Sequence, residues 1–262
     1  MNKFLYCSAA CVISLAGLGA AAAANLPVKA PPLPVAAVYN WTGFYVGGNV
    51  GGSWSNSDVA LYSIAGFPIP LTSANSHQTF NGALGGGQIG YNWQRDKFVF
   101  GVEADAAWRN TSASTQLAFP NGLDFTTFTT RQDAIATFRP RAGVAVNNWL
   151  FYVTGGAAVE EIEHSFVENR PSVAGANRTI SSDDTRWGWT VGAGVEAGFG
   201  RWSAGLEYLY VDFGRTTTLS APAQVLGGVP FGASVVSFND SAQQIVRVKL
   251  NYRFNGPVVA KY

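Results

Sequence analysis

The sequence predicts an all-β fold, an eight-stranded antiparallel β-barrel, and three observations lead to it. Apolar residues alternate with polar or small residues in eight segments, a pattern typical of strands that have two different faces. The connections between these segments alternate strictly between long and short. Charged side chains occupy one face of the predicted strands, whereas aromatic side chains gather on the other face near the strand ends.

The composition excludes several classes of protein. Only 13% of the 262 residues are charged, compared with about 25% in a typical soluble domain. Beyond residue 24 no stretch of about 18 apolar residues occurs, which excludes membrane-spanning helices. The net charge of +1 argues against a nucleic-acid-binding protein. A hydrophobic fraction of 47% argues against intrinsic disorder.

Residues 1–24 have the features of a secretory signal peptide. Lys3 supplies the positive charge, Phe4–Gly19 the apolar stretch and Ala20–Ala24 the small residues of a cleavage site. Both cysteines of the chain, at positions 7 and 11, lie inside this segment. We therefore expect an exported mature chain without cysteine, which excludes disulfides, thiol chemistry and zinc–thiolate sites.

Residues 25–40 follow the signal peptide and contain four prolines, Pro27, Pro31, Pro32 and Pro34. This density of proline disfavours helix and sheet and predicts a semi-rigid, extended tether. The tether is interpreted as a spacer in the periplasm. The alternative interpretation is that it contacts peptidoglycan or a periplasmic protein.

The first four predicted strands carry apolar residues at every second position. They are Trp41–Trp54 with Phe44, Val46, Val50 and Trp54; Phe80–Gln94 with Ala83, Ile89, Tyr91 and Trp93; Phe98–Trp108 with Phe100, Val102 and Ala104; and Arg131–Val146 with Ala134, Phe138 and Val144. Pro140 lies inside the fourth strand. Because proline lacks the N–H that the ladder needs, we expect a bulge or local distortion there.

The last four predicted strands repeat the pattern. They are Trp149–Glu160 with Phe151, Val153 and Val159; Thr185–Phe199 with Trp187, Trp189, Val191 and Val195; Trp202–Phe213 with Leu206, Tyr208 and Tyr210; and Ser241–Phe254 with Val246, Val248, Leu250 and Tyr252. These bounds complete the eight strands and leave residues 255–262 as a C-terminal tail. The barrel itself is therefore predicted over residues 41–254.

The connections place long loops at one end of the barrel and tight turns at the other. The long ones are Ser55–Thr79, Arg109–Thr130, Glu161–Asp184 and Gly214–Asp240, and the short ones are Arg95–Lys97, Asn147–Asn148 and Gly200–Arg201. Outer-membrane barrels have this layout, with short periplasmic turns and long extracellular loops. The sequence thus predicts a transmembrane β-barrel with short periplasmic turns and four long extracellular loops.

The polar face of the strands carries charge in the strand middles, and a membrane barrel would turn this face toward its lumen. The predicted luminal charge network consists of Glu103, Asp105, Arg139, Arg141, Glu196, Glu207, Arg247, Lys249 and Arg253. Counted from the turn end, Glu103 is level with Arg141 and Asp105 with Arg139, while Glu207 is near the level of Lys249; strand shear could shift these pairings by a residue or two. Glycines on this face would leave room for the long side chains. The alternative is the solvated outer face of a soluble barrel.

The aromatic residues near the strand ends predict two girdles on the outer face, because Trp and Tyr rings prefer membrane–water interfaces. The predicted girdle residues are Trp41, Trp54, Trp93, Trp108, Trp149, Trp187, Trp189, Trp202, Tyr208, Tyr210 and Tyr252. The outward residues between the two belts are mostly aliphatic. A packed soluble core would not sort its aromatic residues by height in this way.

Few residues could support catalysis or bind a cofactor. The two histidines, His77 and His164, fall in predicted loops, and His164 has Glu161, Glu163 and Ser165 as sequence neighbours. A nucleophile must lie within hydrogen-bond reach of its base, which sequence neighbours on a loop rarely achieve. No histidine pair has the spacing of metal ligands. We expect no enzyme, no cofactor and no metal site.

Four stretches resemble a known family: Trp41–Gly52, Gly85–Trp93, Leu206–Gly214 and Val246–Phe254. They are similar to segments of the small outer-membrane β-barrel surface antigens of rhizobia and related alphaproteobacteria, often labelled "porin family" and similar to the OmpA transmembrane domain. The resemblance implies an eight-stranded barrel with structural and surface roles, inserted by the barrel-assembly machinery. It also implies a C-terminal insertion signal, comprising Val246, Val248, Leu250, Tyr252 and Phe254, although Tyr262 is a second candidate for its last residue. Haem binding at surface loops, known for some similar proteins, makes both histidines candidates to test.

We therefore expect a structural protein of the bacterial outer membrane that contributes to envelope integrity and presents its loops at the surface. Its expected surroundings are outer-membrane lipids and lipopolysaccharide. An eight-stranded barrel is just wide enough for side chains to fill its interior, which disfavours a diffusion pore. Two alternatives remain: a narrow porin-like channel for ions or small solutes, and a surface ligand-binding or adhesion module that acts through the loops.

Overall fold

The computed structural model describes most of the chain from Tyr39 to Phe254. The described residues are 39–64, 67–68, 75–118, 123–169, 171, 177–214, 216–221, 224–226, 229–231, 234–240 and 242–254. The predicted signal peptide, residues 25–38 of the tether, the C-terminal tail and Tyr262 lie outside these residues. Nowhere in the described part is there a helix long and apolar enough to cross a membrane.

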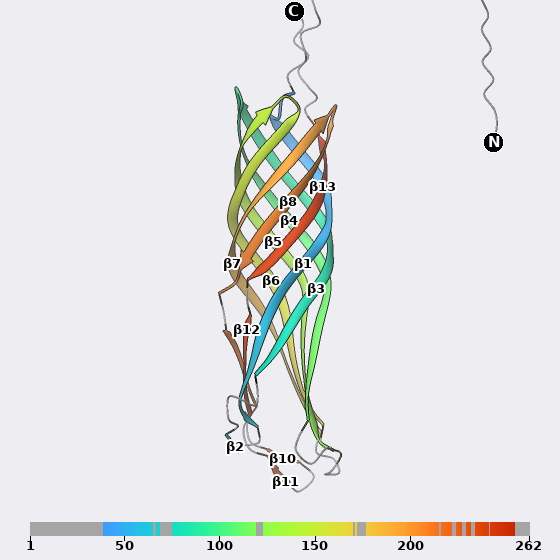
Figure 1. The fold of residues 1–262 in the computed structure, drawn as a ribbon, viewed down its shortest axis with the longest axis vertical. Coiled ribbons are helices and arrows are strands. Elements are labelled where there is room, and N and C mark those ends of the chain that lie inside the picture. The colour runs from blue at the N-terminus through green and yellow to red at the C-terminus, as the bar shows by residue number, and fades with distance from the viewer. Residues whose placement is uncertain are drawn as a thin grey trace, which may run out of the picture. The chain divides into compact units, whose positions relative to one another are not determined.

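Eight long strands form a closed antiparallel ring (Figure 1). They are β1 (Gly43–Ile64), β3 (Asn75–Arg95), β4 (Phe98–Ala118), β5 (Phe125–Val146), β6 (Trp149–Asn169), β7 (Arg178–Phe199), β8 (Trp202–Asp212) and β13 (Gln243–Arg253). Each strand pairs with its sequence neighbour in the ring, and β13 pairs with β1 from Tyr45↔Arg253 to Trp54↔Gln244. The predicted eight-stranded antiparallel barrel is confirmed.

The three short connections all lie at one end of the ring, here called the turn end. Each begins with a residue in the left-handed region: Asp96 (φ 54°), Asn147 (φ 56°) and Gly200 (φ 61°). Glycine adopts this conformation freely, and Asn and Asp tolerate it better than other residues do. The local sequence thus permits three two-residue turns where the strands reverse.

The predicted long connections are mostly strand, so the predicted bounds of the first six strands at the opposite, loop end were wrong, whereas those of β8 and β13 agree with the structure to within two residues. β5 and β6 remain paired as far as Phe125↔Asn169, well inside two predicted loops. The last connection contains β9 (Thr216–Ala221), β10 (Gln224–Leu226), β11 (Val229–Phe231) and β12 (Ser234–Asp240), and the first contains β2 (Phe67–Pro68). These extensions lack apolar alternation, which is why periodicity did not reveal them.

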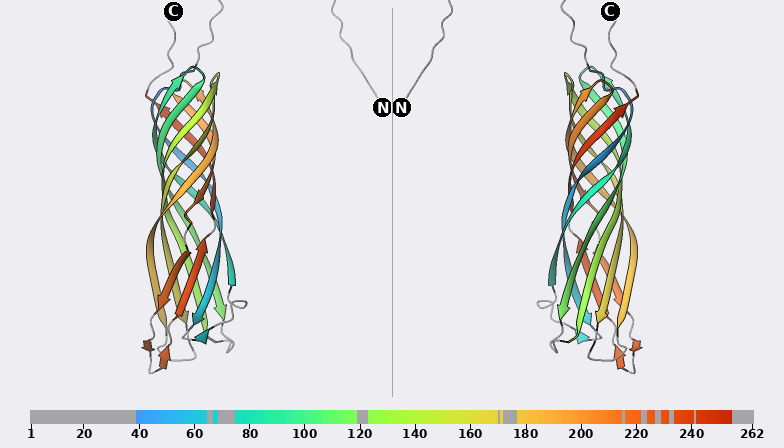
Figure 2. Two further views of the ribbon diagram at one scale, coloured as in Figure 1. Left: turned by 90° about the vertical axis from the view of Figure 1, so that its left-hand side faces the viewer. Right: turned by 90° about the vertical axis from the view of Figure 1, so that its right-hand side faces the viewer.

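The ring splits into two sheets toward the loop end. Pairing of β3 with β4 ends at Leu84↔Arg109, and pairing of β7 with β8 ends at Trp189↔Asp212. Beyond these points β4, β5, β6 and β7 continue as one sheet, whereas β3, β1, β12 and β9 continue as another. Figures 1 and 2 show the two groups of strands diverging below the ring.

The bulge in β5 lies at Asp133 rather than at Pro140. The register with β6 shifts between Gln132 and Ala134, whereas it is the same on both sides of Pro140. The missing proline N–H interrupts the ladder locally, and the Thr154 hydroxyl donates a hydrogen bond to the Pro140 carbonyl at 2.9 Å. Pro140 thus distorts the ladder without inserting a residue.

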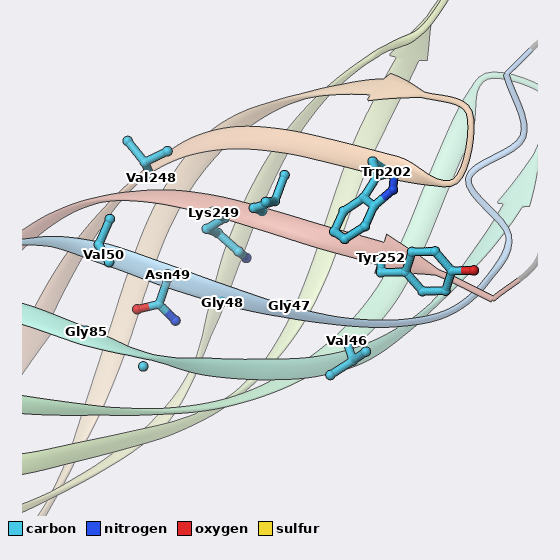
Figure 3. A pocket seen from close by; sticks show the side chains of 12 residues that line it. Val46, Gly47, Gly48, Asn49, Val50, Gly85, Trp202, Val248, Lys249 and Tyr252 are labelled. Atoms are coloured by element: carbon cyan, nitrogen blue, oxygen red, sulfur yellow. The ribbon is translucent and has the colours of Figure 1, made fainter.

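Side chains of the ring alternate between an exposed outer wall and a buried interior. Figure 3 shows this at a shallow hollow of the wall, where Val46, Val50 and Val248 of β1 and β13 are exposed. Their neighbours Asn49 and Lys249 are buried. The barrel therefore has an apolar exterior and a polar interior, the reverse of a soluble barrel.

Candidate functional site

The ring encloses a cluster of eight charged side chains, here called the central charge cluster. Its members are Glu103 and Asp105 of β4, Arg139 and Arg141 of β5, Glu196 of β7, Glu207 of β8, and Arg247 and Lys249 of β13. All eight are buried, because each has the parity of the inward face. Four carboxylates face four cations, so the cluster has no net formal charge.

Glu103 lies at the centre of this cluster. The Lys249 ammonium lies 2.6 Å from both of its carboxylate oxygens, and the Arg139 guanidinium donates to it at 2.7 Å. Arg139 also donates to Asp105 at 2.9 Å and to Glu207 at 3.2 Å. Charge-assisted hydrogen bonds of this kind are stronger than neutral ones, so Glu103 and Arg139 link strands from different parts of the ring.

Arg247 extends the cluster toward the loop end. Its guanidinium donates to Asp105 at 2.7 Å and to Glu207 at 2.8 Å. Asp105 also accepts a hydrogen bond from the Thr137 hydroxyl at 2.5 Å. These bonds satisfy buried carboxylates that would otherwise be costly to remove from water.

Arg141 and two tyrosines occupy the part of the cluster nearer the turn end. The Arg141 guanidinium lies 4.8 Å from the Tyr45 ring centroid and 5.2 Å from that of Tyr152, within the range of cation–π attraction. The Tyr45 hydroxyl donates to Glu103 at 2.7 Å, and the Tyr152 hydroxyl donates to Glu207 at 2.8 Å. The aromatic rings thereby fill space between the ion pairs.

Glu196 completes the cluster through mixed partners. The Arg141 guanidinium donates to it at 3.3 Å, and the Asn251 amide donates at 2.9 Å. The Ser203 hydroxyl also donates to this carboxylate. Polar neighbours on β8 and β13 thus supplement a single ion pair at this position.

The strand register differs from the predicted levels by two residues. Glu103 is opposite Arg139 rather than Arg141, and Glu207 is opposite Arg247 rather than Lys249. Neighbouring strands of a barrel are staggered along its axis, and the shift of two residues is within the range that strand shear was expected to produce. Arg141 still lies 3.7 Å from Glu103, because the long side chain spans the offset.

Glycines give the cluster space on the inner face. A Cβ on Gly101 would lie 3.3 Å from Cγ of Arg141, and one on Gly194 would lie 2.5 Å from the Tyr152 hydroxyl oxygen. Gly90 is in the same situation, because the Tyr45 ring occupies the position of its absent side chain. Large luminal side chains therefore lie directly against glycine backbone.

Arg253 and Trp41 are placed differently from their predictions. Arg253 was predicted in the charge network but lies apart from it at the turn end, beside Tyr39 and Trp41. Trp41 was predicted in the outer girdle, yet it is fully buried inside the barrel. In the strand Trp41–Trp54 that the sequence predicts, Trp41 has the opposite parity to outward-facing Phe44, so the alternation of that predicted strand already indicated the inner face.

Two apolar layers bracket the central charge cluster. At the turn end, buried Tyr39, Trp41, Val99, Leu150 and Tyr152 pack together. Toward the loop end a second layer, here called the loop-end apolar layer, fills the lumen. It consists of Leu84, Ala107, Ile135, Ala158, Leu209, Val211, Phe213 and Ile245. Apolar constrictions resist wetting, so both layers separate the charges from bulk water.

The sequence did not predict a second group of hydrogen-bonded polar side chains, which lies near the loop-end apolar layer. Arg109 donates to Glu160 at 2.7 Å and to Gln243 at 2.5 Å, and Gln243 donates to Glu160 at 2.7 Å. Arg109 had been assigned to a loop. The parity of Glu160 in its predicted strand was an available signal, because it matches the inward positions of that strand.

His164, one of the two residues named as candidates for haem binding at a surface loop, is neither in a loop nor at the surface. His164 lies in β6, fully buried, 3.1 Å from the Thr130 hydroxyl and 2.7 Å from the Arg186 guanidinium. Because residues of a strand alternate between its two faces, Glu161 lies on the exposed outer face of β6, whereas His164 lies on the inner face. His77 lies in β3 rather than in a loop. Throughout the described ranges, no group of three or more His, Cys, Asp or Glu residues is arranged to hold a metal ion.

Most of the predicted girdle residues lie on the outer wall. The exposed ones are Trp54, Trp93, Trp108, Trp149, Trp187, Trp189, Trp202 and Tyr208. Tyr210 and Tyr252 are half-buried because they pack edge-on or tilted against Trp189 and Trp202, with ring centroids 5.6 and 5.1 Å apart. The wall between them carries aliphatic side chains such as Val153, Leu206 and Val248.

Comparisons with known proteins agree with this architecture. The family model described as outer membrane protein beta-barrel domain matches residues 10–254. The 31 kDa outer-membrane immunogenic protein of Brucella melitensis biotype 1 is 33% identical over 240 residues, which cover 89% of this chain and 93% of the relative. The 22 kDa outer membrane protein of Rhizobium leguminosarum bv. viciae is 29% identical over 183 residues, 69% of this chain and 68% of the relative.

A similar solved structure is that of the outer membrane protein OprG from Pseudomonas aeruginosa. It aligns with 82% of this chain and 98% of its own length, at a TM-score of 0.46 and 13% identity.

Proposed function

Because this chain belongs to the outer membrane protein beta-barrel family, we propose that it is a closed, structural barrel that contributes to envelope integrity. The location is the outer membrane, as it is for the relatives. In this proposal the aromatic girdles contact lipid headgroups and lipopolysaccharide, and the barrel-assembly machinery inserts the chain. The lumen serves to hold the wall together rather than to pass solutes.

The observation that supports this proposal is the filled lumen. The central charge cluster pairs four carboxylates with four cations inside the ring, and apolar layers lie on both sides of it. A solute would have to break several buried ion pairs to pass. Separating a buried pair leaves each ion uncompensated, at a cost of roughly several kcal/mol per ion, which argues against a narrow open channel.

We expect the folded protein to be electrically silent in planar lipid bilayers. Before each recording, folding is verified by a mobility shift between boiled and unboiled samples on a gel. A general porin, reconstituted in parallel, shows that the assay detects open barrels. Steady open steps from the verified protein would contradict a closed lumen and favour the alternative, a porin-like channel.

Surface presentation is the second part of the proposal, and the names of the relatives as outer-membrane immunogenic proteins support it. An epitope tag inserted between β10 and β11 is expected to bind antibody on intact cells. The matched control is the same tag in the turn at Asn147–Asn148, which should bind only after the outer membrane is permeabilised. Equal labelling of both tags on intact cells, or the reverse pattern, would overturn the assigned orientation.

A further inference from the structure

The residues just before β1 turn into the mouth of the barrel at its turn end, which is the periplasmic end. The Trp41 N–H donates to the Gln94 side chain at 2.6 Å, and the Gln94 N–H donates to the Thr42 hydroxyl at 3.0 Å. The Tyr39 hydroxyl donates to the Trp202 carbonyl at 3.2 Å. Residues 39–42, here called the mouth segment, therefore contact β3 on one side and β8 on another.

Arg253 of β13 holds the mouth segment from inside. Its guanidinium lies 4.8 Å from the Tyr39 ring centroid and 5.3 Å from that of Trp41. It donates hydrogen bonds to the carbonyls of Asn40 and Thr42, the latter at 3.3 Å. Its side chain is buried, with 1% of its surface exposed. All of these contacts come from the mouth segment.

The charge of Arg253 is compensated differently from those of the central charge cluster. Among the residues that the structure describes, no carboxylate forms an ion pair with Arg253, while the four carboxylates of the central charge cluster pair with the four cations of that cluster. Aromatic faces and carbonyl oxygens replace a carboxylate as its partners. The burial of this cation therefore depends on the mouth segment and not on the cluster.

The barrel wall is shaped for the mouth segment. A Cβ at Gly198 would lie 2.6 Å from the Tyr39 hydroxyl oxygen, so the Tyr39 ring lies where any other residue would place its side chain. Trp41 and Tyr39 form one buried apolar cluster with Val99 and Leu150, two inward residues at the turn ends of β4 and β6. None of residues 39–42 belongs to a strand, and the β1–β13 pairing begins beyond them at Tyr45.

We propose that the mouth segment is a plug that closes the periplasmic mouth and can leave it while the barrel stays folded. The ladder hydrogen bonds and the central charge cluster are complete without residues 39–42, which makes the plug separable from the ring. When the plug leaves, Arg253 becomes hydrated and a water-filled vestibule opens between the turn end and the central charge cluster. Because residues 25–38 lead directly into the plug, tension on that stretch acts on the plug first.

Reactivity of introduced thiols tests this proposal in the full chain, after Cys7→Ala and Cys11→Ala substitutions remove the natural cysteines. The Val99→Cys substitution reports on the mouth, because Val99 is buried against the plug. The matched control is Ala107→Cys, because Ala107 is buried in the loop-end apolar layer, on the far side of the central charge cluster from the mouth. A small charged maleimide is the probe, and a gel shift on boiling verifies folding.

We expect plug variants to raise the labelling rate at position 99 about tenfold and to leave position 107 unchanged, because they weaken the cation–π and charge-assisted contacts that hold the plug. The variants are Arg253→Gln, Tyr39→Ala and Trp41→Ala. An unchanged rate at position 99 in all three would show that these residues do not close the mouth. Faster labelling at both positions, or loss of folding in all three variants, would overturn a separable plug. Bilayer silence is unaffected, since the cluster still fills the lumen.

Discussion

Replacing Glu103 by glutamine is expected to lower the free energy of unfolding by about 3–5 kcal/mol, the cost of breaking a buried ion pair by removing one partner. Glu103 contacts the Lys249 ammonium at 2.6 Å and the Arg139 guanidinium at 2.7 Å, all three being buried. Without its charge, four buried cations face three carboxylates. The amide oxygen can still accept hydrogen bonds, but the neutral amide cannot compensate the excess positive charge.

Urea unfolding in lipid vesicles, followed by tryptophan fluorescence, measures this loss. The matched control is Glu161→Gln, because Glu161 is exposed on the outer side of β6. A surface substitution of this kind is expected to change stability by no more than about 0.5 kcal/mol. If the two variants unfold at the same urea concentration, the luminal ion pairs contribute nothing to stability and the structural role of the cluster fails.

A double-mutant cycle isolates the pair from the rest of the cluster. Combining Glu103→Gln with Lys249→Met leaves three carboxylates and three cations, so the excess charge disappears. We expect the double variant to be more stable than the sum of the single losses predicts, with a coupling of about 1–3 kcal/mol. Additive losses would show that Lys249 and Glu103 do not stabilise each other.

The ring and its charge cluster could be predicted from the sequence because one physical rule governs both. Alternate residues of a strand face opposite sides, so the exposure of Val248 and the burial of Lys249 follow from their order along β13. The structure was needed to show which charged side chains form ion pairs across the lumen. The two-residue offset between Glu103 and Arg141 arises from strand stagger, which no single strand encodes.

The loop-end extensions could not be predicted, because the alternation disappears there. In the β4 extension, the outward-facing positions hold Ser112 and Ser114, and the neighbouring positions are mostly polar as well. A strand segment of this composition cannot be distinguished from a polar loop by its sequence. The threonines that begin β5, such as Thr126 and Thr130, were the remaining signal, since β-branched residues favour strands. The same boundary error hid Arg109 and placed His164 in a loop.

Replacing Gly86 by alanine is expected to destabilise the barrel by about 1–3 kcal/mol, as overpacking of a filled interior does. Gly86 faces the lumen, where its Cβ would lie 2.6 Å from the Cα of Ala107 and against the Ala106 carbonyl. Both obstacles are backbone atoms of a paired strand, so they cannot move aside as the tip of a flexible side chain would. The strands themselves must shift.

The neighbouring glycine provides a matched control on the opposite face of β3. A Cβ on Gly85 would meet the Asn49 carbonyl and Val50 at 3.9 Å, which is ordinary contact on the outer wall. Alanine there restricts the unfolded chain and is expected to raise stability by about 0.4–1 kcal/mol. Unfolding of both variants in vesicles measures the difference. If both substitutions change the free energy of unfolding equally, the glycine run serves chain flexibility. If Gly86→Ala destabilises the barrel and Gly85→Ala stabilises it, glycine is needed where the lumen is full and is dispensable one residue away.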